Sequence, residues 1–291
     1  WLRRQRQMCI RDSLYSALKL GLFDYVSKNN FEKVLVGLSG GIDSALTATI
    51  AVDSLGSDNV VGVALPSKYN TEESLVDARL LAENLDIEFK VIEIEEIVNI
   101  FRNTLKESVN GELGQTTDEN IQSRVRGNIL MALSNQTGAM VVSTGNKSEM
   151  AVGYSTLYGD LAGGFALLKD LYKTEVYNLA NFRNSISSVI PQNTIDKEPS
   201  AELRPDQFDK DSLPEYELLD EILRMYIEED SSSEKIISKG IDENIVYDVL
   251  SKVDRNEYKR KQVAPGVKLT EKAFGKDRRM PITNTYIRER G

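Results

Sequence analysis

Histidine is absent from the sequence, and cysteine occurs once, as Cys9. The lack of histidine excludes Ser-His-Asp triads, imidazole acid–base catalysis and His-ligated zinc. A single cysteine excludes an intrachain disulfide, a CxxC redox pair and a Cys-rich zinc site. We therefore expect a reducing, cytoplasmic setting, in which any metal is a hard cation held by carboxylates and phosphates.

Long apolar runs are also missing, since none approaches the ~20 residues that a membrane-crossing helix needs. The 291 residues, 41% of them hydrophobic, are enough for one large α/β domain or for a domain with a helical appendage. The net charge of −9 argues against a nucleic-acid-binding surface spread over the whole protein. We expect neither nucleic acid nor a membrane among its partners.

The charge is unevenly distributed along the chain. Residues 251–291 carry 12 Lys or Arg against 5 Asp or Glu, a local balance of +7 on an otherwise acidic protein. Such a basic tail is usually a solvated surface. It is also suited to bring cations to an anionic ligand.

The chain starts at Trp1, and the first stretch, "WLRRQRQMCIRD", shows neither a helical nor a strand period. It also lacks the apolar segment of a signal peptide. We expect residues 1–12 to be a fragment end or a cloning scar and leave them out of the fold prediction, and we assign no catalytic role to Cys9 within them.

Apolar spacing predicts alternating helices and strands from Ser13 onward, where a helix begins. Thr71 is the expected N-cap of one of the helices that follow. Strands are predicted over 33–38, 59–65 and 87–94 and within 138–146, where the strand runs into a glycine turn. The helices between them are predicted over 44–55, 70–85, 95–108 and 118–136. Strands joined by helices of this length indicate a parallel, doubly wound, Rossmann-like α/β sheet, whose ligands lie beyond the carboxyl ends of the strands.

The C-terminal half of the sequence lacks this alternation of strands and helices. Residues 184–214 are rich in Pro, Asn, Asp and Ser and predict a long loop. Helices are expected around 215–229 and 242–253, and residues 255–291 form the basic tail.

A glycine-rich turn, Ser39 to Ser44, joins the first predicted strand to its helix and lacks the lysine of a Walker loop. Gly40 and Gly41 allow a tight turn that approaches a ligand closely, and its N–H groups form an anion site. A carboxylate beside phosphates, here Asp43, makes sense if Mg²⁺ lies between them. A plain glycine turn that places an Asp at a helix start would show the same local pattern.

The stretch "SGGIDS" after a first strand resembles the pyrophosphate loop of N-type ATP pyrophosphatases, which include NAD, GMP and asparagine synthetases and tRNA-thiolating enzymes. In that superfamily the loop holds pyrophosphate as a leaving group, which explains why it needs no Walker lysine. The stretch 143–180, "STGNKSEMAVGYSTLYGDLAGGFALLKDLYKTEVYNLA", resembles the synthetase domain of glutamine-dependent NAD synthetases. Segments "NIQSRVRGNILMALSN", "PSAELRPDQ", "DSLPEYELLD" and "EYKRKQVAPGVK" match too, so the resemblance covers about residues 13–287.

The resemblance implies a reaction and a set of residues. ATP adenylates the nicotinate carboxylate of deamido-NAD, and ammonia then displaces AMP to give NAD. Asp43, Lys173 and Glu149 are the implied catalytic residues, with Asp43 and Glu149 as Mg²⁺ ligands. The implied ATP-binding residues are Gly37, Leu38, Ser39, Gly40, Gly41, Ile42, Asp43, Ser44, Thr144, Lys173 and Ser200.

For deamido-NAD the matching positions are Asn120, Arg124, Glu149, Tyr154, Tyr258 and Lys259, with Tyr158 a weaker match. Simpler interpretations stay open: Glu149 as a carboxylate that offsets a helix dipole, Arg124 and Arg126 as solvated helix cations, and Tyr154 as a packing residue. If the matches hold, the basic tail is a cationic flap that closes over the dinucleotide.

The chain departs from ammonia-dependent relatives at Leu157, where they have a lysine, and this groups it with the glutamine-dependent type. We expect the N-terminal glutaminase domain of that type to be absent, and free ammonia, or ammonia from a missing portion, to be the nitrogen source. The family also implies a homodimer. Two alternatives remain, namely another ATP pyrophosphatase, such as a GMP synthetase or a tRNA-thiolating enzyme, and a regulatory nucleotide-binding domain without turnover.

Overall fold

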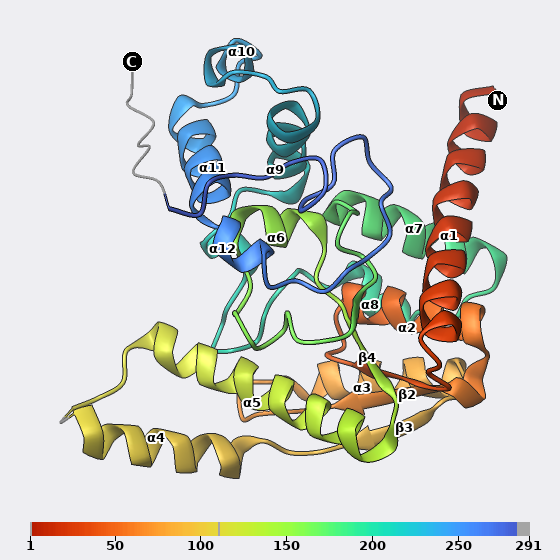
Figure 1. The fold of residues 1–291 in the computed structure, drawn as a ribbon, viewed down its shortest axis with the longest axis vertical. Helices are drawn as coiled ribbons and strands as arrows, with labels where there is room; N and C mark the ends of the chain where they lie inside the picture. The colour runs from red at the N-terminus through yellow and green to blue at the C-terminus, as the bar shows by residue number, and fades with distance from the viewer. Residues whose placement is uncertain (1, 110, 284–291) are drawn as a thin grey trace.

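A computed structural model describes residues 2–109 and 111–283 (Figure 1). Trp1 of the expected leader and residues 284–291 of the basic tail lie outside the described residues. None of the helices in the described part of the chain is both long and apolar enough to cross a membrane.

Five parallel strands form one sheet in the order β3-β2-β1-β4-β5. Their bounds are β1 (Val34–Gly37), β2 (Val60–Ala64), β3 (Glu88–Val91), β4 (Met140–Ser143) and β5 (Phe165–Ala166). Val34 of β1 pairs with Val60 on one side and with Met140 on the other. The predicted parallel α/β sheet is confirmed, and the four predicted strands are present with ends trimmed by a few residues. The two-residue β5 gives too short an apolar run to be recognised from the sequence.

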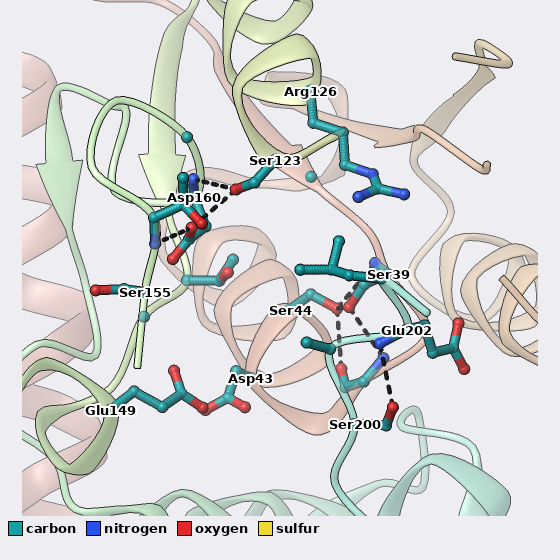
Figure 2. Close-up of a pocket in the computed structure, with 18 of the residues that line it drawn as sticks. Ser39, Asp43, Ser44, Ser123, Arg126, Glu149, Ser155, Asp160, Ser200 and Glu202 are labelled. Atoms are coloured by element: carbon teal, nitrogen blue, oxygen red, sulfur yellow. Dashed lines mark hydrogen bonds between the residues drawn. The ribbon is translucent and has the colours of Figure 1, made fainter. Parts of the chain in front are cut away.

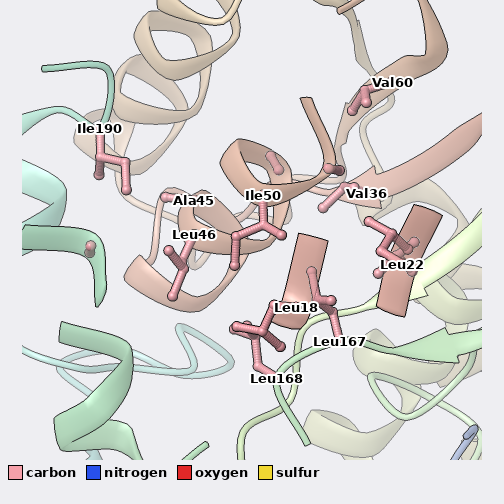
Figure 3. Packing of buried hydrophobic residues seen from close by; sticks show 14 of the residues in the cluster. Leu18, Leu22, Val36, Ala45, Leu46, Ile50, Val60, Leu167, Leu168 and Ile190 are labelled. Atoms are coloured by element: carbon pink, nitrogen blue, oxygen red, sulfur yellow. The ribbon is translucent and has the colours of Figure 1, made fainter. Parts of the chain in front are cut away.

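Helices cover both faces of the sheet. One face carries α1 (Leu2–Lys28), α2 (Ile42–Leu55), α3 (Glu72–Asn84), α7 (Lys173–Ile186) and α8 (Gln192–Asp196). The other carries α4 (Glu95–Val109) and α5 (Gln115–Thr137), which run side by side (Figure 1). In the first layer Leu18 and Leu22 of α1 share a buried cluster with Leu46 and Ile50 of α2 (Figure 3). Burying one such side chain contributes about 1.5–3 kcal/mol, so this cluster anchors the layer that carries the glycine-rich turn.

Part of the expected leader is helical, because α1 begins at Leu2. From Met8 to Asp12 the helix buries no side chain, which explains why no apolar period marks it. Helix propagation from the packed turns after Ser13 carries it outward, since adding a residue to an existing helix is easier than starting one. Arg11 donates to the Asn178 side chain of α7 at 2.9 Å, so this part of the helix contacts the domain.

A second helical cluster follows the sheet in sequence. It comprises α6 (Lys147–Val152), α9 (Tyr216–Leu223), a π-helical turn (Arg224–Glu228), α10 (Ser233–Ile237), α11 (Glu243–Arg255) and α12 (Glu257–Arg260). These elements, apart from α12, contribute to a separate apolar core that also contains Tyr172. The predicted helix over 215–229 therefore continues past Leu223 as a π turn, and the predicted loop over 184–214 contains the end of α7, all of α8 and a 3-10 turn (Asp209–Asp211).

The strand order reverses between β1 and β4, which are neighbours in the sheet although two strands separate them in sequence. In doubly wound sheets a crevice opens beyond the carboxyl ends of the strands at this point. The turn after β1 and the turn after β4 both end there, so the fold places the two glycine-containing motifs side by side.

Candidate functional site

A cavity of about 510 Å³ lies beyond the carboxyl ends of β1 and β4. This volume is in the range of sites for small molecules and cofactors. Residues from the turn after β1, from α5, from α6 and from segment 197–209 line it. Four parts of the chain that are far apart in sequence therefore share one site.

The turn between β1 and α2 is held by its own side chains (Figure 2). The Ser39 hydroxyl accepts from the Gly41 N–H at 3.2 Å, and the Ser44 hydroxyl donates to the Gly41 carbonyl at 2.9 Å. The two hydroxyl oxygens lie 3.3 Å apart. Bonds of 3.2–3.3 Å are weak, so these donors can be exchanged for the oxygens of an anion without a large loss.

Gly40 is required for a reason that the sequence did not show. Its φ is +81°, and a Cβ there would lie 2.3 Å from the Ser74 carbonyl oxygen in the first turn of α3. The close approach is therefore to α3 and not to the cavity, which Gly40 does not line. Thr71 caps α3 by accepting from the Ser74 N–H, as predicted.

Lys173, the first residue of α7, joins the two implied catalytic carboxylates. Its ammonium group is hydrogen-bonded to the Asp43 carboxylate and lies 3.2 Å from Oε1 of Glu149. Asn146, the N-cap of α6, donates to the other Asp43 oxygen at 2.9 Å and accepts from the Glu149 N–H at 3.0 Å. Figure 2 shows Asp43 and Glu149 pointing toward one another across the cavity floor.

The charges in this cluster shift one another's protonation. Burial raises the pKa of Glu149 to about 8; Lys173 opposes this shift and Asp43 adds to it. Burial acts against the charged form of Lys173, but Asp43 and Glu149 outweigh it and raise the lysine pKa. Lys173 is therefore a permanent cation at neutral pH, and such perturbed groups in a cavity are typical of functional sites.

Asp209 is a member of this site that the sequence analysis missed. It lines the cavity, is 6% exposed, and accepts from the Tyr216 hydroxyl at 2.8 Å. Burial raises its pKa, while the charge of Lys173 and the Tyr216 hydrogen bond lower it. It follows the quoted segment "PSAELRPDQ" by two residues, and an isolated Asp in a loop gives no periodic signal. Asn146, inside the quoted "STGNKSE", was missed as well.

The opposite wall of the cavity is formed by α5 and by the loop after α6. The Thr156 hydroxyl donates to the Asn120 side chain at 2.8 Å. Arg126 is half-buried, donates to the Leu65 carbonyl and to Asn70, and burial lowers its pKa to about 10. A solvated helix cation, the simpler interpretation, is therefore wrong for Arg126. It fits Arg124, which is exposed and donates to the Leu157 carbonyl.

Most of the residues singled out from the sequence meet in this cavity. Those that line it are Gly37, Leu38, Ser39, Gly41, Ile42, Asp43, Ser44, Asn120, Thr144, Glu149, Tyr154, Lys173, Ser200 and Lys259. The structure does not bring Gly40, Arg124, Tyr158 or Tyr258 to the lining. The side chains of Tyr158 and Tyr258 are 65% and 44% exposed, so neighbouring residues do not hold either ring in the site.

Two lining residues donate hydrogen bonds to backbone carbonyls of other residues. The ammonium of Lys259, on α12, donates to the carbonyls of Gly153 and Ser155 at 2.6 and 2.7 Å. The Ser200 hydroxyl donates to the Gln207 carbonyl at 2.5 Å. Both side chains thus shape the walls of the cavity, and the start of the basic tail is packed against the loop after α6.

The residues present fit a Mg²⁺ ion bound together with phosphates. Two carboxylates, Asp43 and Glu149, already converge on one cation, the Lys173 ammonium. Within the described residues no group of three or more acidic, His or Cys side chains is placed to hold a metal by itself. Mg²⁺ typically takes one or two carboxylates and obtains its remaining ligands from substrate phosphates and water, which agrees with this set.

Residues 14–263 match the sequence profile of the family described as NAD synthase. A relative from Aquifex aeolicus, called glutamine-dependent NAD(+) synthetase, is 54% identical over 277 residues, which are 95% of this chain and 49% of the relative. A solved structure of a glutamine-dependent NAD+ synthetase from Acinetobacter baumannii, in complex with ADP, is 47% identical, with a TM-score of 0.63 over 92% of this chain and 49% of that one. A structure of an NMN synthetase from Francisella tularensis is 28% identical, with a TM-score of 0.74 over 89% and 98%. The chain thus spans about half the length of the curated relatives it matches.

Proposed function

The chain belongs to the NAD synthase family, and from that premise we propose that it amidates deamido-NAD to NAD at the expense of ATP. The observation that carries the proposal is the meeting of the SGGxDS turn, Lys173 and Glu149 in one cavity. A turn of this kind binds phosphates, and a buried permanent cation next to it suits a reaction at one of them.

In the first step a carboxylate oxygen of the nicotinate forms a bond to the α-phosphorus of ATP, and the bond to pyrophosphate breaks. The N–H groups of the turn, with the hydroxyls of Ser39 and Ser44, would hold the departing pyrophosphate. Lys173 would stabilise the negative charge that grows on the α-phosphate in the transition state. It stays charged because Asp43 and Glu149 raise its pKa.

In the second step ammonia forms a C–N bond with the carbonyl carbon of the adenylate, and the C–O bond to AMP breaks. The nitrogen loses one proton, so the products are NAD, AMP and a proton. Asp43 and Glu149 would hold Mg²⁺, which supplies charge neutralisation for the phosphates when bound. The half-buried wall of Asn120, Tyr154 and Lys259 lies opposite the turn and would hold deamido-NAD.

The nitrogen source is tested by comparing donors. NAD formation from deamido-NAD, ATP and Mg²⁺ should proceed with ammonium and not with glutamine. The physical reason is that glutamine hydrolysis of the Cys-dependent kind needs a cysteine activated by its surroundings. The single cysteine of this sequence, Cys9, is exposed. Because Cys9 is also free, we propose in addition a reducing cytoplasmic setting. Equal rates with both donors would contradict the ammonia proposal, and no NAD with either would contradict the function.

Other acceptors must be tested in the same assay. The NMN synthetase neighbour makes nicotinate mononucleotide the first competitor, and XMP and tRNA represent the other ATP pyrophosphatases. ATP–pyrophosphate exchange should depend on deamido-NAD and not on these three. Exchange with XMP or tRNA and none with deamido-NAD would overturn the assignment, while a preference for the mononucleotide would change the substrate.

One variant distinguishes the proposed enzyme from a regulatory nucleotide-binding domain without turnover. Asp43→Asn keeps the shape of the turn but removes the carboxylate that would bind Mg²⁺. Turnover should fall at least about 100-fold, with a much smaller change in nucleotide binding measured by calorimetry. Turnover equal to that of the unchanged protein would remove the role of Asp43 in the reaction.

We also propose that the chain pairs with a second copy through the outer face of α4. Ile97, Ile100 and Phe101 are 37%, 61% and 47% exposed and share one face at helical spacing. The inner face of the same helix buries Val98, so α4 is apolar on two sides. An unpartnered apolar face of this kind is typical of a protein interface.

A further inference from the structure

The first two N–H groups of α7 belong to Lys173 and Thr174, and they are bonded by side chains from two other helices. Ser148 of α6 accepts from the Lys173 N–H at 2.9 Å. Asp220 of α9 accepts from the Thr174 N–H at 2.9 Å through one carboxylate oxygen. Helix starts leave their first N–H groups without a partner in the helix, so these bonds fix where α7 begins.

The two side chains are also bonded to each other. The Ser148 hydroxyl donates to the second carboxylate oxygen of Asp220 in a short hydrogen bond. One hydroxyl therefore accepts from α7 and donates to α9, and one carboxylate accepts from both α6 and α7. A carboxylate with two such donors has a single preferred orientation.

The side chains of this connected set are buried: Ser148, Lys173 and Asp220 are 0%, 3% and 2% exposed. Each bond between buried groups is more costly to break than a bond on the surface. Lys173 lines the cavity, whereas Ser148 and Asp220 are not among its lining residues and therefore lie behind it.

Ser148 and Asp220 affect the positions of Glu149 and Lys173. Ser148 directly precedes Glu149, and the amide that it bonds belongs to Lys173 itself. The Lys173 ammonium lies 3.2 Å from Glu149 across the cavity floor. A shift of either helix start would change that distance, and a misplacement of about 1 Å at a reacting group can cost 100-fold in rate.

We propose that Asp220 and Ser148 are a positioning pair that holds Lys173 opposite Asp43 and Glu149 for the adenylation step. This proposal rests on the proposed function, since it assigns Lys173 to the charge that develops on ATP. Asp220 does not touch the ligand and acts only through the starts of α6 and α7.

The test compares Asp220→Ala, Ser148→Ala and the double variant with the unchanged protein in NAD formation with ammonium. Asp220→Ala and Ser148→Ala should each lower kcat by about 10–100-fold, the range typical for groups that hold a reactive side chain from behind. The KM for ATP should change much less, because Lys173 acts in the transition state. The double variant should lose no more than Asp220→Ala alone, because both belong to one connected set.

Asp220→Asn is the conservative variant. Its side-chain oxygen can still accept from the Thr174 N–H, and its NH₂ can donate to Ser148. It should recover a large part of the kcat that Asp220→Ala loses, which a simple loss of buried charge would not predict.

Asp53→Asn is the matched control. Asp53 also anchors α7, but at its other end, where it accepts from both Arg183 nitrogens at 2.6 and 3.0 Å. This variant should lower the midpoint of thermal unfolding and leave kcat within about twofold of the unchanged protein. If Asp220→Ala lowers kcat no more than Asp53→Asn does, the positioning role is overturned. If the unchanged protein forms no NAD, the proposed function fails instead.

Discussion

At the scale of single residues, the site depends on one cation shared between two carboxylates. Lys173 is 130 residues from Asp43 and 24 residues from Glu149 along the chain, yet it contacts both. A buried charge without partners is costly: the two carboxylates raise the pKa of Lys173, whereas burial and the charge of Asp43 raise the pKa of Glu149. Perturbed pKa values of this kind follow from the arrangement and not from any one residue.

Replacing Lys173 by methionine tests the cation directly. Lys173→Met should lower kcat by about 100- to 1,000-fold, since the charge that grows on the α-phosphate loses its partner. Steady-state NAD formation measures this. Lys169→Met is the control, because Lys169 is a half-buried lysine that donates to the Ala264 carbonyl and does not contact Asp43. A loss of similar size in both variants would show that any lost lysine has this effect.

Asp220 and Asp53 should give stability a pH dependence of opposite sign. Burial raises the pKa of Asp220, although hydrogen bonds from Ser148 and Thr174 lower it. The folded protein therefore keeps this proton to a higher pH than the unfolded chain does. The resulting stability is present below the unfolded pKa, near 4, and is lost as pH rises through the folded pKa.

For Asp53, burial is outweighed by the hydrogen bonds from Arg183 and Tyr15, which lower its pKa. Its contribution is present above the unfolded pKa and is lost as pH falls through the folded pKa. Urea unfolding between pH 3.5 and 7 measures both. As pH rises, the unchanged protein should lose stability relative to Asp220→Asn and gain stability relative to Asp53→Asn. Differences of the same sign would contradict the two pKa directions.

At the scale of elements, the turn after β1 is positioned by α3 as much as by its own bonds. Gly40 packs against the Ser74 backbone, and Ser74 also donates to Glu202 at 2.6 Å. Glu202 pairs with Lys197 at 2.7 Å and belongs to segment 197–209, which also lines the cavity. The start of α3 therefore links the glycine-rich turn to this segment.

Gly40→Ala should lower the free energy of unfolding by more than the positive φ of Gly40 alone explains. A positive φ costs an alanine about 1 kcal/mol, and the clash with Ser74 adds to this because backbone must move. The free energy of unfolding should drop by more than in Gly138→Ala, and the KM for ATP should rise. Gly138 is the matched control, since its φ of +74° is similar and nothing lies within 4 Å of a Cβ there. Equal losses in the two variants would show that the contact with α3 is not tight.

Most elements could be predicted from the sequence because their signals are local. Leu18 and Leu22 mark the buried face of α1, and the glycines after β1 mark a turn. The unexpected start of α1 at Leu2, the short β5 and the π turn after Leu223 leave no such signal, since they are set by helix propagation or by packing against neighbours. Asp209 and Asp220 escaped notice for the same reason: a buried acid in a loop or helix is recognisable only from what surrounds it.

At the scale of the whole molecule, two apolar cores meet at the site. The sheet and its helices supply Asp43, and the C-terminal helical cluster supports Glu149 and contacts the first residues of α7 through Ser148 and Asp220. The site therefore lies where the two cores join. A change in how the two cores pack would therefore alter the geometry of the site directly.

Association of two copies is predicted to depend on α4. Ile100→Glu should convert a dimer into a monomer in sedimentation velocity, because a charge would be buried in an apolar interface. Leu20→Glu is the control, since Leu20 is 64% exposed on α1 and has no assigned partner. A monomeric unchanged protein, or a dimer in Ile100→Glu, would contradict pairing through this face.

The sequence by itself determined the parallel α/β sheet, the glycine-rich turn after β1 and the family, because hydrophobic period, turn glycines and motif spacing are properties of contiguous residues. Only the tertiary structure decided that Lys173 bridges Asp43 and Glu149, that Gly40 faces α3 and not the cavity, and that Asp220 stands behind the lysine. These contacts join residues 24 to 130 positions apart. They exist because the packing of the sheet with its helices, and of the C-terminal helical cluster beside them, brings those residues together, and no local pattern encodes that packing.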